Sequence, residues 1–158
     1  KPHLAQAFVN LNKAVMDNAG SISSDFKRII AYISSNTAGC RYCQAHTIRA
    51  AERFGEEKER LEEAWNFENS ALFSEAEKVA LRFTIAASSV PVSTSKELEQ
   101  SLHAHWDETD ILEIMSVIAL FGYLNRWNDV MGTSLEEEAK NSAERLLQSQ
   151  WKIGKHAT

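Results

Sequence analysis

Residues that interrupt regular structure are scarce in this 158-residue sequence, which has two prolines and six glycines. Its two cysteines are too few for the disulfide framework of a small secreted domain. No apolar run approaches the roughly 18 residues that a membrane-spanning helix needs, and no signal-peptide pattern opens the chain. These absences predict a soluble cytoplasmic protein, and a start at Lys1 rather than at methionine allows for a missing native N-terminus.

Positive charge is limited as well. The chain has 17 lysines and arginines against 22 aspartates and glutamates, which gives a net charge of −5. Nucleic acids and anionic membranes are bound by basic surfaces, so this balance disfavours both as partners.

Segments with the apolar period of an amphipathic helix fill most of the sequence, and none shows the sustained alternation of a strand. The chain is 44% hydrophobic and long enough to bury a sizeable core. We therefore expect residues 1–158 to form one domain, an all-α helical bundle of about eight helices. The expected helices cover about residues 4–17, 24–33, 40–54, 56–65, 75–85, 95–103, 111–130 and 135–150.

Several helix starts are marked by the residues that precede them. Ser74–Glu77 and Thr94–Glu97 have the spacing of a capping box, in which the first and fourth side chains bond each other's backbone N–H groups. Asp107 or Thr109 begins the most apolar helix. We expect the tail from Lys152 onward to be frayed.

Two segments align without gaps when Asp25 is set against Asp110. Cys40–Cys43 then falls on Asn125–Asn128, and about 23 aligned positions contain four identities. A true duplication and a chance similarity between apolar helices are equally open. In a duplication, the second copy keeps the shape of the first and replaces both thiols with amides, and it is then structural or lines the site from the opposite side.

The cysteines carry the clearest chemical signal. Gly39 places Cys40 near a helix N-terminus, where free N–H groups and the helix dipole favour a thiolate. Arg41 is a neighbouring positive charge, and His46 can accept a thiol proton. The three-residue spacing puts both sulfurs on one face, so one thiolate can attack a peroxide or disulfide and the other can resolve the intermediate. His46 is closer to Cys43 around the helix axis, which predicts Cys43 as the activated thiolate.

Other interpretations of these residues remain open at this point. The reverse assignment, with Cys40 as the thiolate, is reasonable because Cys40 is nearer the helix start. Both cysteines can instead be inert core residues, and His46 can be a partly buried structural histidine. A zinc site would need a distant ligand such as His103 or His105, because no second Cys/His pair lies at finger-like spacing. We therefore expect no metal.

The segment Ser34–Thr47 resembles the signature of the carboxymuconolactone decarboxylase superfamily, and more narrowly its AhpD-like alkylhydroperoxidase branch. Ala119–Asp129 resembles the second half of that branch, so the resemblance covers about 130 residues. It implies an all-helical homo-oligomer, often a trimer or hexamer. It also implies reduction of a hydroperoxide by the cysteine pair, regeneration by a thiol or dithiol reductant, and no cofactor. Decarboxylase members generally lack the cysteine pair, which argues against lactone decarboxylation.

Two positions depart from the family pattern. The family histidine position is Thr47 here, with His46 one residue earlier, and the relay glutamate position is Arg28, which cannot act as a base. Glu113 occupies the aligned position in the second segment and is a candidate to supply the missing carboxylate. A structural ion pair of Glu113 with Arg28 or Arg126 is the alternative.

Four more side chains are candidates to line the site. Tyr42 and Trp127 have the bulk to form a hydroperoxide pocket, although aromatic residues at helical spacing are more often core. Asn125 and Asn128 need partners if buried, so they face the site or bridge helices. The sequence as a whole predicts an antioxidant thiol peroxidase. The alternatives are a protein-disulfide reductase and an oligomeric redox sensor or binding protein without turnover.

Overall fold

The computed structural model describes residues 1–157, and within them the chain is helical, with no β-strand. This confirms the all-α prediction and the number of helices. The helices are α1 (Pro2–Met16), α2 (Ser24–Ala38), α3 (Arg41–Arg53), α4 (Lys58–Glu63), α5 (Glu75–Ser88), α6 (Lys96–His105), α7 (Glu108–Met131) and α8 (Glu137–Leu147). Short 3-10 turns follow at η1 (Ala64–Asn66), η2 (Gln148–Gln150) and η3 (Gly154–His156).

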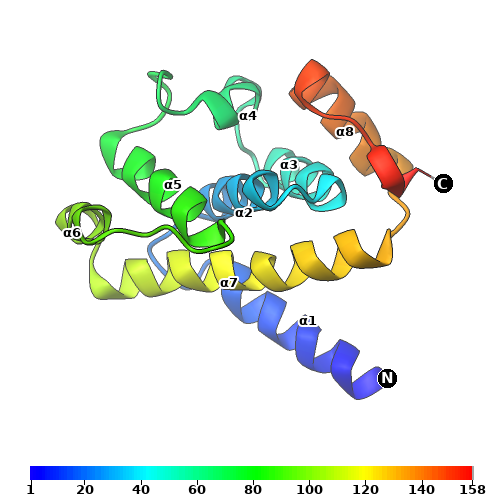
Figure 1. Cartoon of the computed structure of the whole chain (residues 1–158), viewed down its shortest axis with the longest axis horizontal. Coiled ribbons are helices and arrows are strands. Elements are labelled where there is room, and N and C mark those ends of the chain that lie inside the picture. The colour runs from blue at the N-terminus through cyan, green and yellow to red at the C-terminus, as the bar shows by residue number, and fades with distance from the viewer. Residues whose placement is uncertain (158) are drawn as a thin grey trace.

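Helix α2 lies at the centre and packs against α3, α5 and α7 (Figure 1). Ile29, Ile30 and Ile33 are completely buried, because this helix has neighbours on nearly every side. Helix α7 crosses beneath α2 and α3, and α8 covers the other side of α3. None of the helices within residues 1–157 combines the length and apolar character that a bilayer crossing requires.

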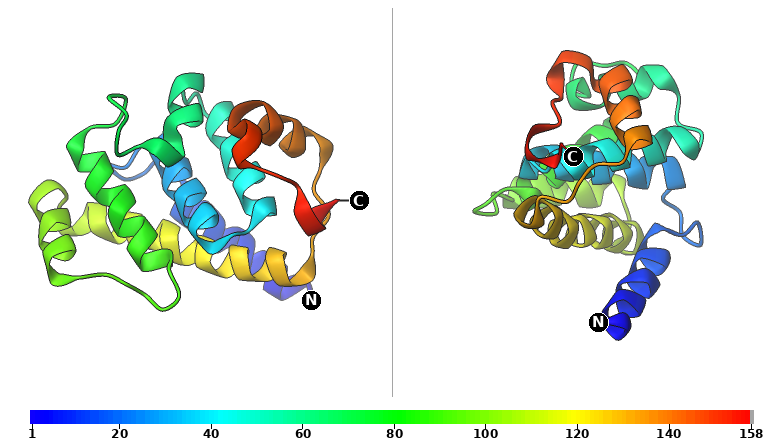
Figure 2. Two further views of the ribbon diagram at one scale, coloured as in Figure 1. Left: turned by 45° about the horizontal axis from the view of Figure 1, so that its top comes forward. Right: turned by 90° about the vertical axis from the view of Figure 1, so that its right-hand side faces the viewer.

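Helix α1 is the exception to this packing. It projects from the rest of the molecule in Figure 1 and in the right-hand view of Figure 2, and it buries none of its residues. Its main contact is with α7, where the rings of Phe8 and Tyr123 stack at 5.9 Å between centroids. Leu4, Val9 and Leu11 of α1 remain exposed. This helix therefore presents apolar surface that the single chain does not cover.

The expected helix starts are mostly confirmed. Ser74 and Glu77 form the predicted capping box, and Asp107 caps α7. The box predicted at Thr94–Glu97 is wrong by one residue, because the hydroxyl of Ser95 accepts the N–H of Leu98 and α6 begins after it.

The C-terminal segment is packed rather than frayed over residues 152–157, and residue 158 lies outside the described residues. Trp151 is buried and its indole N–H donates to the carbonyl of Arg41 at 3.1 Å. His156 is also buried, with Nδ1 2.8 Å from the carbonyl of Thr133. The prediction of fraying was wrong because the two ring side chains find partners near the start of α3 and the end of α7, far away in the sequence.

Candidate active site

A glycine separates α2 from α3. Gly39 has φ 78° and ψ 9°, a left-handed conformation that glycine adopts without steric cost. Its N–H and that of Cys40 donate to the last carbonyls of α2, including the carbonyl of Ser35. The chain can therefore restart as α3 at Arg41, with Cys40 as the N-cap residue. The predicted break at Gly39 is confirmed.

The N-cap position gives Cys40 a thiolate-stabilising environment. Its sulfur accepts the backbone N–H of Cys43 at 3.3 Å. The pKa of Cys40 is lowered, chiefly because the Cys43 thiol donates a hydrogen bond to it; burial opposes this, and the backbone N–H groups of Cys43 and Tyr42 assist. The pKa of Cys43 is strongly raised, because its proton is shared with Cys40 and because it is buried. Of the two thiols, Cys40 therefore has the surroundings that favour a thiolate, whereas the sequence favoured Cys43.

His46 is held by a carboxylate rather than by a sulfur. Its Nε2 lies 2.7 Å from Oε2 of Glu136, and its ring packs against that of Tyr42 at 4.4 Å between centroids, tilted by 36°. Within residues 1–157 no hydrogen bond joins His46 to Cys40 or Cys43. His46 therefore stands beside the thiols as part of a separate cluster, and its predicted role as direct proton acceptor for Cys43 has no hydrogen bond to support it.

Glu136 completes that cluster and was not singled out from the sequence. The Tyr42 hydroxyl donates to its Oε1 at 3.4 Å. Desolvation and then the Glu136 charge and this hydrogen bond raise the pKa of Tyr42 to about 12. Desolvation acts to raise the pKa of Glu136, but its backbone N–H, His46 and Tyr42 outweigh it and lower that pKa. Glu136 is 90 residues from His46 in the sequence, and no local pattern signals the contact.

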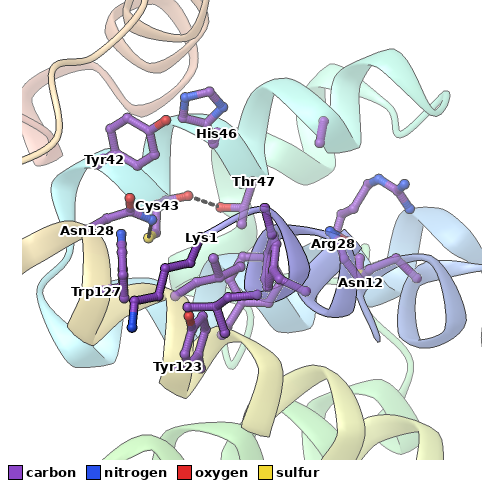
Figure 3. A pocket seen from close by; sticks show the side chains of 17 residues that line it. Lys1, Asn12, Arg28, Tyr42, Cys43, His46, Thr47, Tyr123, Trp127 and Asn128 are labelled. Atoms are coloured by element: carbon purple, nitrogen blue, oxygen red, sulfur yellow. Dashed lines mark hydrogen bonds between the residues drawn. The ribbon is translucent and has the colours of Figure 1, made fainter. Parts of the chain in front are cut away.

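Cys43 faces a partly open pocket of about 840 Å³, whose walls come mainly from α1, α3 and α7, with Arg28 of α2 at one end (Figure 3). One face of α3 contributes Cys43, His46, Thr47 and Ala50, which are spaced three or four residues apart as on a single helix face. The remaining wall is mainly apolar and aromatic. From α1 and α7 it includes Leu4, Phe8, Phe121, Tyr123, Leu124 and Trp127. Cys40 is not among the lining residues, so Cys43 is the thiol that a bound molecule meets.

Asn128 contacts the pocket thiol from α7. Its Nδ2 donates to the sulfur of Cys43 at 3.6 Å, and this contact acts to lower the pKa of Cys43. The Thr133 hydroxyl donates to Oδ1 of Asn128 at 3.0 Å and fixes the amide orientation. Asn128 is the residue that aligns with Cys43. The structure thus places the two aligned positions against each other across the site.

Of the other expected site residues, some line the pocket and others do not. Tyr42 and Trp127 line the pocket. Asn125 does not; it is buried, and neither polar atom of its side chain has a hydrogen-bond partner within residues 1–157. Arg28 lines the pocket at the end away from Cys43, as Figure 3 shows.

Glu113 is placed away from the cysteines. It forms an ion pair with the buried Lys27 at 2.8 Å and accepts the N–H of Ser21. It meets neither Arg28 nor Arg126, the partners considered from the sequence. It precedes Asn128 by fifteen residues on one continuous helix, a separation of about 22 Å. A relay role for Glu113 has no support in this arrangement, because its carboxylate secures the link between α1 and α2.

Comparisons with known proteins agree with this architecture. Residues 2–86 match the model of the carboxymuconolactone decarboxylase family. The uncharacterized protein YnjA of Escherichia coli (strain K12) is 33% identical over 93 residues, which is 58% of this chain. The matched segment spans only half of the length of YnjA.

Solved structures extend the similarity across the fold. The debrominase Bmp8 is 35% identical, with a TM-score of 0.87 over 92% of this chain and 77% of that one. A cysteine-to-alanine variant of Bmp8 in complex with 2,3,4-tribromopyrrole gives 34% identity and a TM-score of 0.88, over 92% and 78% of the two chains. An uncharacterized peroxidase-related protein from Ralstonia eutropha JMP134, an alkylhydroperoxidase AhpD core, is 18% identical with a TM-score of 0.77 over 88% and 74%. At that identity it supports the fold alone.

Proposed function

The chain belongs to the carboxymuconolactone decarboxylase family, and we propose that it is a dithiol-dependent reductase of organic hydroperoxides. The observation that carries this proposal is the position of Cys43, whose sulfur lies in the wall of the apolar pocket with Cys40 hydrogen-bonded behind it. One thiol meets the substrate, and the other holds the negative charge.

The pocket supports an organic substrate rather than hydrogen peroxide. Its volume of about 840 Å³ lies within the range of sites that enclose drug-sized molecules. A molecule as small as hydrogen peroxide gains little from aromatic walls such as Tyr123 and Trp127, whereas an apolar organic group is stabilised by burial against them.

The proposed reaction consumes one hydroperoxide for each dithiol. As the Cys40 thiolate takes the proton of Cys43, the Cys43 sulfur bonds to the terminal peroxide oxygen and the O–O bond breaks. The alkoxide leaves as an alcohol after it receives that proton. The Cys40 thiolate then attacks the sulfenic sulfur of Cys43, forms the disulfide and displaces hydroxide, which becomes water on protonation.

The cluster of His46, Glu136 and Tyr42 is suited to proton supply at the pocket. Glu136 fixes the His46 ring by the 2.7 Å contact, as carboxylates do for histidines that transfer protons. We assign His46 the protonation of the hydroxide that leaves when the disulfide forms, with Glu136 and Tyr42 as positioning residues.

Turnover requires partners outside this chain. An external thiol or dithiol reductant returns the disulfide to two thiols, and the cytoplasm is the compartment that keeps such thiols reduced. The apolar residues of α1 that remain exposed in the single chain support assembly as a homo-oligomer of the trimer or hexamer type.

Reductive dehalogenation is a second candidate, favoured by the 35% identity to the debrominase Bmp8 over nearly the whole of this chain. The same dithiol supplies two electrons. An aryl bromide and two thiols become the debrominated arene, hydrogen bromide and the disulfide. An apolar pocket with aromatic walls is compatible with either substrate.

The test is single-turnover oxidation of the fully reduced, reductant-free protein. We expect cumene hydroperoxide to remove both thiols much faster than hydrogen peroxide at equal concentration. In parallel, 2,3,4-tribromopyrrole is supplied with dithiothreitol and bromide release is measured. Bromide release without thiol loss to either peroxide would replace the first candidate by the second. No thiol loss with either peroxide and no bromide release would remove both.

A further inference from the structure

The charge of the pocket contrasts with that of the chain. The chain has a net charge of −5, yet the residues that line the pocket include the cations Lys1 and Arg28 and no aspartate or glutamate. An apolar cavity with cations and without carboxylates favours an anionic group in whatever it binds.

Arg28 is the cation built into the pocket wall. Arg28 as a whole residue is more than nine-tenths buried. The Cζ atom of its guanidinium lies over the Phe54 ring, 3.4 Å from the ring centroid. Nη1 donates to the carbonyl and hydroxyl of Ser24 at 2.5 and 2.6 Å. Nε and Nη2 donate to no residue in the part of the chain that is described, and no carboxylate there lies within ion-pair distance. Nε and Nη2 are also not among the buried polar atoms that lack a partner, so these donors are accessible to an incoming anion.

The surroundings of Arg28 do little to balance its charge. Burial lowers the pKa of Arg28, and Asp25 opposes this only from a distance. A carboxylate matches the geometry of the free Nε and Nη2 donors, and such a pair is stronger in a desolvated site than in water.

The distance between Arg28 and Cys43 sets the shape of the ligand. Phe54, on which the guanidinium stacks, follows Cys43 by eleven residues along α3, or about 16 Å. Thr47 and Ala50 line the pocket between these points. Figure 3 places Arg28 at one end of the pocket and Cys43 with Asn128 at the other. A ligand that reaches both must be elongated and apolar in its middle.

We propose that the pocket binds an elongated amphiphilic carboxylate, whose anionic end is held by Arg28 and whose reactive group lies at Cys43. The assignment of the reactive group rests on the proposed function; the assignment of the anionic end does not. Fatty-acid hydroperoxides have this chemistry, because a carboxylate ends an apolar chain that carries the hydroperoxide at a distance.

Binding of unreactive probes tests the anionic end without any thiol chemistry. Calorimetry measures the Kd of laurate and of methyl laurate, which differ in charge but share the apolar chain. We expect the wild-type protein to bind laurate at least about tenfold more tightly, since a charged hydrogen bond is stronger than a neutral one. The more apolar ester is favoured if hydrophobic burial alone decides, so the comparison is stringent.

Variants of Arg28 separate charge recognition from a structural role. Arg28→Gln is expected to weaken laurate about tenfold and to leave methyl laurate unchanged, whereas Arg28→Lys keeps the preference for laurate. Arg53→Gln is the control, because Arg53 is an exposed arginine at the end of α3 that does not line the pocket. Equal binding of the two probes by the wild-type protein would overturn the proposal. So would an equal loss of both probes in Arg28→Gln. If Arg28→Gln does not fold, the wild-type comparison and Arg28→Lys still decide.

Two reactive probes, a fatty-acid hydroperoxide and its methyl ester, test whether the Arg28 site affects turnover. Linoleic acid hydroperoxide should oxidise the dithiol about tenfold faster than its methyl ester at subsaturating concentrations, and Arg28→Gln should remove the difference. Preference for laurate without oxidation by either hydroperoxide would retain the carboxylate site and reject the proposed function. Oxidation by both hydroperoxides at equal rates would retain the function and reject the role of Arg28.

Discussion

Segments 25–47 and 110–132 align without gaps, yet the first folds as two helices and the second as part of one. In the first, Gly39 ends α2 and Cys40 caps a new helix. In the second, Leu124 stands at the position of Gly39, and α7 continues through it. The residues that correspond to Cys40 and Cys43 are Asn125 and Asn128.

The difference shows what a helix break contributes to reactivity. The backbone N–H groups of the first helical turn have no partner within the helix, so a sulfur at the N-cap position can accept a hydrogen bond from one of them. In the interior of a helix, the backbone N–H groups are already bonded to backbone carbonyls. Cys40 receives that bond, and its pKa is lowered. The unbroken α7 offers no such position, and its Asn128 serves the thiol from outside through a side-chain amide.

The largest expected effect comes from making the first segment resemble the second at its first thiol. Cys40→Asn removes the thiol that forms the disulfide and holds the charge, so turnover should stop. Asparagine is a strong N-cap residue, so the free energy of unfolding should not fall. Steady-state peroxidase assays and thermal unfolding measure the two effects separately. Retained turnover would show that Cys43 is resolved by a thiol from elsewhere.

The second-largest effect is expected for His46→Met, which places at position 46 the residue type found at the aligned position of the second segment, Met131. Loss of a general acid should lower turnover about a hundredfold, with little change in substrate affinity. Glu136→Gln keeps His46 but removes its charged partner, and a decrease of about tenfold is expected. If the pair acts as a unit, the double variant should be no slower than His46→Met alone. Additive losses would contradict the assigned positioning role.

Gly39→Ala tests the break itself. A side chain in the left-handed conformation costs about 1–2 kcal/mol. No atom lies within 4 Å of the added Cβ, so a steric clash does not add to this backbone strain. Gly122→Ala in the continuous α7 is the control, with open space at its Cβ and an expected gain of up to about 1 kcal/mol. Chemical denaturation should show a lower free energy of unfolding for Gly39→Ala and a higher one for Gly122→Ala. Changes of the same sign in both variants would contradict the contrast between the two segments.

The same Gly39→Ala variant has a predicted pH effect. Because the pKa of Cys40 is lowered, wild-type thiolate absorbance should persist below the pH at which an ordinary thiol is protonated. It should be lost only as the pH falls through that lowered pKa. Weakening the N-cap in Gly39→Ala should move the midpoint to higher pH. An unchanged midpoint would mean that the contact with Cys43 alone sets the pKa of Cys40.

The smallest effect is expected at Asn128. Asn128→Ala removes the donor to Cys43, which should raise the pKa of Cys43 further and slow single-turnover oxidation about threefold. Asn141→Ala, at an exposed position of α8, is the control. A loss as large as that of His46→Met would show that Asn128 has a direct role in the reaction.

Local features of the fold were predictable from the sequence. The apolar period fixed the helical class, Ser74 and Asp107 marked helix starts, and Gly39 marked the break before Cys40. Each of these depends on interactions within a few residues, which is why the sequence reveals them.

Contacts between distant segments were not predictable. Glu136 meets His46 across 90 residues, and the C-terminal tail packs because Trp151 and His156 find partners near α3 and α7. Helical spacing placed His46 near Cys43 but could not show that Glu136 holds it. Nor could spacing show that the surroundings lower the pKa of Cys40 and raise that of Cys43.

The central claim is that Cys43 attacks the substrate while Cys40 holds the negative charge. Dimedone labelling followed by mass spectrometry tests it directly, after a single exposure of each one-cysteine variant to cumene hydroperoxide. The account predicts a sulfenic acid on Cys43 in Cys40→Asn, formed more slowly than the wild-type disulfide, and none in Cys43→Ser. A sulfenic acid on Cys40 in Cys43→Ser, with Cys43 unreacted in Cys40→Asn, would contradict it.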